Sequence, residues 1–212
     1  CLEADGWAII NHPYALAPWI EYDWTSEAFH AIEVYNGGAR FDAWDAKGLS
    51  AWEERIGRGE SLVPVGGSDC HVWSTEAPGE LLTPAMGWPT TRVYVHEGES
   101  VLDALTQGRV VVAEPGTELS LVAISDRTAV GPGEHIEQPA EVQVYARSVE
   151  TDLRLQLVEI GGAVIAETSM EDGEAVLSLD LTKGIYYARV WPTAETITFH
   201  GGVGMTAALY VD

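Results

Sequence analysis

The run with the most specific chemistry is Gly66–His71, which reads GGSDCH and directly follows the apolar stretch Leu62–Val65. In an extended backbone, residues two apart point to the same side. Asp69 and His71 can therefore offer a carboxylate oxygen and an imidazole nitrogen to one point in space. This pair of donors suits Zn, Mn or Fe. A tight turn of the Asx type that happens to contain a histidine is the simpler alternative.

Three more polar residues lie inside or directly after apolar runs. His12 closes the run 6–11, and Glu33 lies inside the apolar run 31–35, with Asn36 directly after it. A buried carboxylate needs a metal, a cation or backbone donors as its partner. His12 and Glu33 are therefore candidate metal ligands, and the Asn36 side chain can serve the same pocket. The alternatives are a structural histidine and a glutamate on a solvated strand edge.

The elements that would position these residues alternate between strand and helix in residues 1–116. Apolar runs predict strands, and apolar residues at helical spacing predict helices. The strands are expected at 6–11, 31–35, 62–65, 91–95 and 109–112, and the helices at 41–56 and 100–105. Such alternation is typical of a largely parallel α/β unit.

Beyond residue 116 the helical spacing disappears and apolar residues alternate with polar ones. Alternating strands are expected at 119–122, 142–145, 153–157, 176–179, 185–190 and 207–211. The dipeptides Gly161-Gly162 and Asp172-Gly173 are typical of hairpin turns. We therefore expect residues 117–212 to form an all-β antiparallel sandwich that folds by itself, and residues 1–116 to need it or a second chain.

Charge excludes some partners. The chain carries 33 acidic and 11 basic side chains, a formal net charge of -22. Binding to a phosphate backbone needs clustered Lys and Arg, so nucleic acid is not expected as a partner. No apolar run approaches the ~20 residues of a spanning helix, so no membrane span is expected either.

The order of these segments resembles a known superfamily. His12 in NHP, Glu33 and Asn36 in IEVYNG, and Asp69 and His71 in GSDCH are followed by PTTRVYV and ALTQGRVVV. This order is similar to the C-terminal half of the PHP (polymerase and histidinol phosphatase) superfamily. The subgroup it most resembles contains carbaryl-type hydrolases and metal-dependent phosphoesterases, which often carry a β-rich C-terminal domain.

The resemblance covers roughly residues 6–116 and implies a distorted (β/α) barrel with divalent metals at the C-terminal ends of its strands. His12, Asp69 and His71 match metal-ligand positions, and Glu33 matches a position near the site. The implied activity is hydrolysis of a small-molecule phosphoester or related ester by water that a divalent metal (Zn, Mn or Fe) activates. The expected fold class is thus α/β, a partial PHP-type barrel, followed by the sandwich.

The sequence departs from the family in one large respect. Family members begin with an HxH motif and supply two further ligands before the NHP segment, and none of these occurs here. A βαβ unit takes about 30 residues, so 1–116 would hold only half a barrel. We expect a C-terminal piece of a longer protein, or a half that pairs with another chain. The alternative is a catalytically inactive half-barrel whose β-sandwich acts as a binding or structural module.

Overall fold

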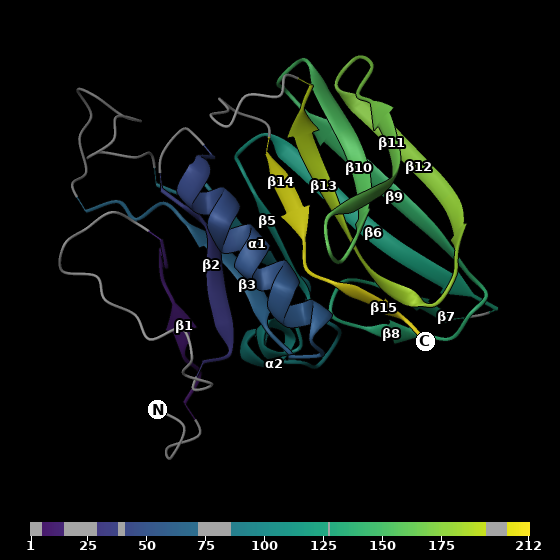
Figure 1. Cartoon of the computed structure of the whole chain (residues 1–212), viewed down its shortest axis with the longest axis horizontal. Helices are drawn as coiled ribbons and strands as arrows, with labels where there is room; N and C mark the ends of the chain where they lie inside the picture. Colours follow the sequence, from purple (N-terminus) through teal and green to yellow (C-terminus); the bar gives the residue numbers. More distant parts are fainter. Residues whose placement is uncertain (1–5, 15–28, 38–40, 72–85, 127, 194–202) are drawn as a thin grey trace.

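The fold is dominated by β-structure (Figure 1). The structure, a computed structural model, describes residues 6–14, 29–37, 41–71, 86–126, 128–193 and 203–212. Within these ranges the chain forms fifteen strands but only two helices, and no sheet closes into a barrel. The expectation of an α/β class built on a partial barrel was therefore wrong.

A small parallel sheet holds the first three strands, in the order β1-β2-β3. They are β1 (Ile9–Ile10), β2 (Ala31–Asn36) and β3 (Val63–Gly67). Helix α1 (Ala43–Gly57) packs on β2. The approach is close at Gly48, where an added Cβ would lie 3.1 Å from the Glu33 carbonyl oxygen.

The remaining strands form two larger sheets. The eight-stranded sheet has the order β11-β10-β13-β14-β5-β4, with β15 beside β13 and β8 beside β15, and the four-stranded sheet has the order β12-β9-β6-β7. The bounds of the first sheet are β4 (Thr90–Val93), β5 (Val110–Ala113), β8 (His135–Ile136), β10 (Leu153–Glu159), β11 (Ala163–Ser169), β13 (Gly184–Pro192), β14 (Gly204–Thr206) and β15 (Leu209–Val211). Those of the second are β6 (Thr117–Ser125), β7 (Thr128–Val130), β9 (Ala140–Ser148) and β12 (Glu174–Leu181).

The barrel prediction failed at β4 and β5. These strands pair antiparallel with each other, and the short helix α2 (Val101–Thr106) lies in the connection between them. On its other edge β5 pairs with β14, close to the C-terminus. Two strands that precede residue 116 thus belong to a sheet made mostly of later strands. The domain boundary at residue 116 stays a prediction.

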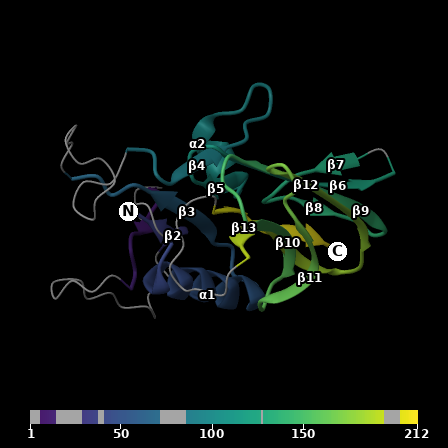
Figure 2. The ribbon, with the colours of Figure 1, turned by 90° about the horizontal axis from the view of Figure 1, so that it is seen from above.

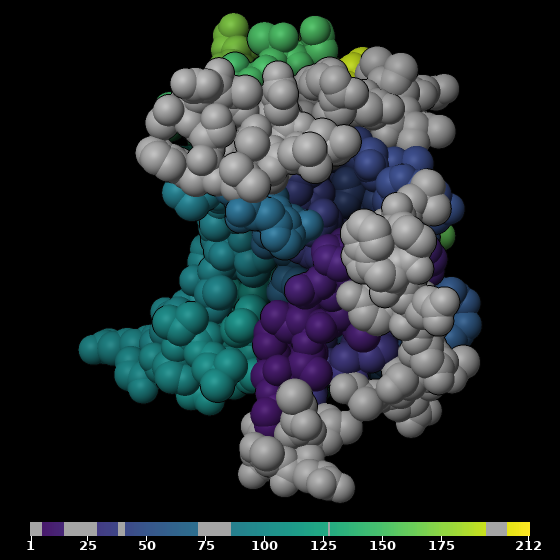
Figure 3. Space-filling model, turned by 90° about the vertical axis from the view of Figure 1, so that its left-hand side faces the viewer, coloured from purple at the N-terminus to yellow at the C-terminus, as the bar shows by residue number. Residues whose placement is uncertain are grey.

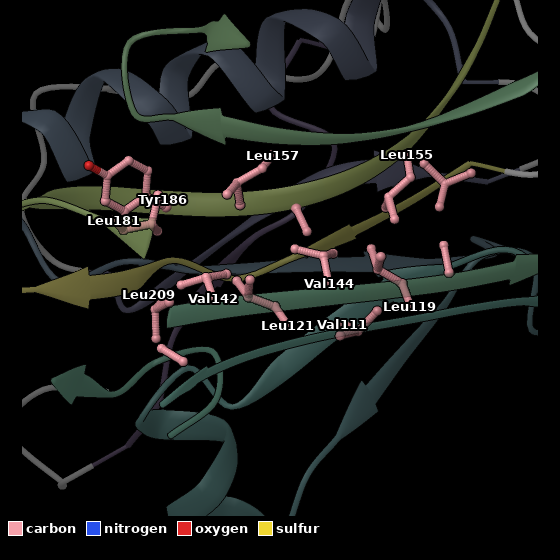
Figure 4. Close-up of a cluster of buried hydrophobic side chains, with 14 of the residues drawn as sticks. Val111, Leu119, Leu121, Val142, Val144, Leu155, Leu157, Leu181, Tyr186 and Leu209 are labelled. Carbon is pink, nitrogen blue, oxygen red and sulfur yellow. The ribbon is translucent and has the colours of Figure 1, made fainter. Parts of the chain in front are cut away.

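The two larger sheets pack face to face. Leu155 and Leu157 of β10 point toward Val142 and Val144 of β9 (Figure 4). All four side chains are fully buried. The alternation of buried and exposed residues along β9 matches the sequence pattern, because successive side chains of a strand point to opposite faces.

A second apolar cluster joins the small sheet to the eight-stranded sheet. Trp52 of α1 meets Tyr187 of β13 edge to face, with ring centroids 5.3 Å apart, and Phe41 meets Trp191 at 4.9 Å. Such aromatic pairs stabilise beyond their buried area by about 0.5–1.5 kcal/mol each. Helices α1 and α2 lie on opposite sides of the sheets (Figure 2).

Neither helix in the described ranges is long and apolar enough to cross a membrane.

The edge of β3 is tied to β4 through one side chain. The Thr91 hydroxyl donates to the Gly66 carbonyl oxygen and accepts from the Gly66 N–H, both at 2.8 Å. Gly66 has no room for a side chain, because an added Cβ would lie 2.5 Å from Val112 Cγ1 and 2.9 Å from the Tyr35 carbonyl oxygen.

We therefore predict that Gly66→Ala lowers the free energy of unfolding by about 1–3 kcal/mol, the usual cost of overpacking. The control is Gly57→Ala at the end of α1, where an added Cβ meets only Ile160, at 3.4 Å. Urea unfolding of both variants checks the prediction. A Gly66→Ala variant as stable as Gly57→Ala would show that the two sheets are not packed this closely.

Candidate metal site

The candidate ligands gather at the edge of the small sheet where its parallel strands end. His12 lies two residues after β1, Glu33 lies inside β2, and Asp69 lies two residues after β3. Because the strands are parallel neighbours, their carboxyl ends meet at one edge. Polar groups that a long stretch of sequence separates are therefore brought to one side of the sheet.

Glu33 is the best-buried of these residues, with 9% of its surface exposed. Its Oε2 accepts from the His12 backbone N–H at 2.6 Å and from Asn36 Nδ2 at 3.0 Å. Burial raises the pKa of Glu33, and the negative charge of Asp69 adds to that rise, while the two hydrogen bonds and His12 oppose it. The pKa of Glu33 thus depends on His12, which follows β1, and on Asp69, which follows β3.

The second oxygen of Glu33 is available. Within the described ranges Oε1 accepts no hydrogen bond, and it lies beside Gly67, whose added Cβ would be 3.5 Å away. This oxygen therefore lies on the β3 side of the carboxylate, next to the strand that leads into Asp69.

Strained backbone marks two of the predicted ligands. His12 has φ 29° and Asp69 has φ 48°, both in the left-handed region that favours glycine. The His12 ring nitrogen Nδ1 is buried and has no hydrogen-bond partner among the residues that the structure describes. Strain of this kind concentrates at functional sites, where the surrounding structure holds it in place.

Asp69 and His71 contact each other rather than a shared third point. Asp69 Oδ1 lies 2.9 Å from His71 Nε2, and the two side chains are 38% and 79% exposed. The sequence prediction placed both donors on one side of an extended strand. The positive φ of Asp69 breaks that extension, and β3 itself ends at Gly67.

The donor set fits a divalent ion only in part. A buried imidazole nitrogen without a partner, an available carboxylate oxygen and a carboxylate–imidazole pair are all ligand types that Zn, Mn or Fe accept. Across the described ranges, however, no three His, Cys, Asp or Glu side chains lie close enough together to hold a metal. Among the described candidate ligands, Asp69 and His71 bring two side-chain donors into contact, whereas His12 meets Glu33 through its backbone N–H.

A pocket of about 120 Å³ lies against this edge, and the sequence analysis missed part of its wall. Besides His12, Glu33 and Asn36, it is lined by Pro13, Tyr14, Asp42, Trp44 and Asp45. Asp42 is the N-cap of α1 and forms a capping box with Asp45. Two acids three residues apart at the start of a helix, one at the N-cap and one in the first turn, are the signal that could have found them.

Asp45 is nearly buried, with 7% of its surface exposed. Burial raises its pKa to about 8, assisted by the charges of Asp42 and Glu33 and opposed by two backbone N–H donors. Its carboxylate form therefore predominates only above that pH.

The opposite edge of the small sheet has a different character. A hollow of about 430 Å³ lies between the β1 segment and the α2 segment (Figure 3). Its lining residues are Gly6, Trp7, His30, Ser61, Val63, Leu102 and Thr106. Among the residues that the structure describes, this lining includes no carboxylate.

Comparison with known proteins adds no relative: no family model, no curated protein and no solved structure matches this chain.

The strain at His12 can be measured by comparing two substitutions at that position. Glycine adopts a positive φ without cost, whereas alanine keeps a penalty of about 1 kcal/mol. We therefore predict that His12→Gly is more stable to urea than His12→Ala by about 1 kcal/mol.

Asn11 is the matched control, because its φ is not positive. There the usual order should hold, with Asn11→Ala at least as stable as Asn11→Gly. If the alanine variant were at least as stable as the glycine variant at both positions, the strain at His12 would be contradicted.

Proposed function

We propose that this chain carries ligands of a metal-dependent hydrolase of the PHP type, acting on a small phosphoester or related ester. The observation that carries the proposal is the hydrogen bond from the His12 backbone N–H to Glu33. Glu33 is a buried carboxylate with one available oxygen. The order of motifs in the sequence supports it independently. The site belongs to the edge of an open three-stranded sheet, not to a barrel.

Glu33 and His12 would hold one side of the metal, and Asp69 and His71 the other. A divalent ion, when bound, lowers the pKa of a coordinated water and polarises the ester oxygen. The chain's own residues supply orientation: the His12 N–H and the Asn36 amide fix Glu33 Oε2, so that Oε1 keeps one direction.

The charge of the chain bears on the substrate. A net charge of -22 repels a phosphoester anion, so the metal would have to supply the local positive charge. We therefore expect hydrolysis to depend entirely on added metal.

The test is hydrolysis of bis(4-nitrophenyl) phosphate after EDTA treatment and addition of Mn²⁺ or Zn²⁺. We predict that the rate appears only with metal and that Asp69→Asn and Glu33→Gln lower it by at least about tenfold. Metal content after dialysis should fall in the same two variants.

Asp103→Asn serves as the control, because Asp103 lies in the first turn of α2 and hydrogen-bonds Ser100. It removes the same charge away from the site. A wild-type rate equal to that of Asp69→Asn, with equal metal content, would contradict the proposal.

One observation favours the second candidate, a binding or structural module without catalysis. The described residues bring no three metal-ligating side chains together. Under this alternative the chain takes up no more metal than Asp69→Asn does, and the assay above separates the two functions.

A further inference from the structure

Asp45 makes more contacts than a helix cap requires. Its Oδ2 accepts from the backbone N–H of the N-cap Asp42 at 2.8 Å, the ordinary bond of a capping box. Its Oδ1 accepts from the backbone N–H of Asn36 at 2.9 Å. The first turn of α1 is therefore fastened to the end of β2 through one carboxylate.

The connection continues from Asn36 to the candidate ligands. The Asn36 side chain donates to Glu33 Oε2 at 3.0 Å, and the same oxygen accepts from the His12 N–H at 2.6 Å. His12 has a strained φ of 29°, so it needs an interaction that holds it there. The short bond to Glu33 is such an interaction.

We propose that Asp45 is a positioning residue, which fixes His12 and the direction of Glu33 Oε1 through Asn36. The inference rests on the proposed function, because it assigns Asp45 to the metal site described above. Asp45 touches neither His12 nor any reacting group, and it acts through the backbone of Asn36.

The N-terminal cap of α2 contains a carboxylate that does not have this role. Asp103 occupies the same place in α2 as Asp45 does in α1, and it accepts from the Ser100 hydroxyl. It is exposed, and within the described residues its carboxylate bonds the Ser100 side chain rather than a strand end. Asp103→Asn is thus a matched control for Asp45→Asn, because each removes one cap carboxylate.

The experiment uses the whole chain at pH 8.5, above the pKa of Asp45. Mn²⁺ affinity is measured by calorimetric titration, and the His12 amide proton is followed by NMR in the metal-free chain. A second variant, Asn36→Ala, breaks the same connection but leaves the helix cap intact.

We expect Asp45→Asn and Asn36→Ala to weaken Mn²⁺ binding about tenfold, as loss of a ligand's hydrogen-bond partner does. Both should also move the His12 amide proton upfield, because a short bond to a carboxylate holds it downfield. Asp103→Asn should change neither quantity.

An unchanged His12 amide shift in both variants would overturn the proposal even if metal binding fell. Equal Mn²⁺ affinity in wild type and both variants would overturn it as well. A wild type that binds no Mn²⁺ would overturn the proposed function, and the His12 shift would then still report separately on the connection through Asn36.

Discussion

Burial of Tyr35 between the small sheet and the rest of the molecule constrains everything near it. The side chain is fully buried, and its hydroxyl donates to Glu114 Oε1 at 2.5 Å. Glu114 directly follows β5, and its backbone N–H donates to the Val203 carbonyl oxygen. A carboxylate buried this deeply must be hydrogen-bonded, so β2 cannot move away from the eight-stranded sheet without a large cost. Glu33 and Asn36, which lie on the same strand, are therefore held in place as well.

The small sheet concentrates unfavourable terms at one edge. A buried glutamate with a raised pKa and two residues with positive φ each lower stability. Positive φ also occurs at Asp126, Asp152 and Asp172, but there it is not combined with a buried carboxylate like Glu33. Because unfavourable features are tolerated where function requires them, the combination of a buried carboxylate with two strained candidate ligands is a physical reason to look for function at the carboxyl edge.

Sequence patterns predicted the local elements well, because they depend on neighbouring residues. The helix expected over 41–56 is confirmed as α1, and the alternation around 142–145 is confirmed in β9. Partner choice is a long-range property, and there the prediction failed: β5 pairs with β14, three residues long and without a periodic signal. For the site, a strand end indicated His12, and a carboxylate inside an apolar strand indicated Glu33. The positive φ of Asp69 and the burial of the Asp45 side chain depend on tertiary packing, which no local sequence pattern encodes.

The central claim is that a divalent ion binds at the carboxyl edge of β1–β3, and paramagnetic broadening by Mn²⁺ tests it most directly. Substoichiometric Mn²⁺ is added to the isotope-labelled chain, and the loss of each amide signal is recorded. The account predicts that the signals of His12, Glu33 and Asp69 disappear first. Broadening that begins instead around Glu99 and Glu134, or spreads evenly over this acidic surface, would contradict it.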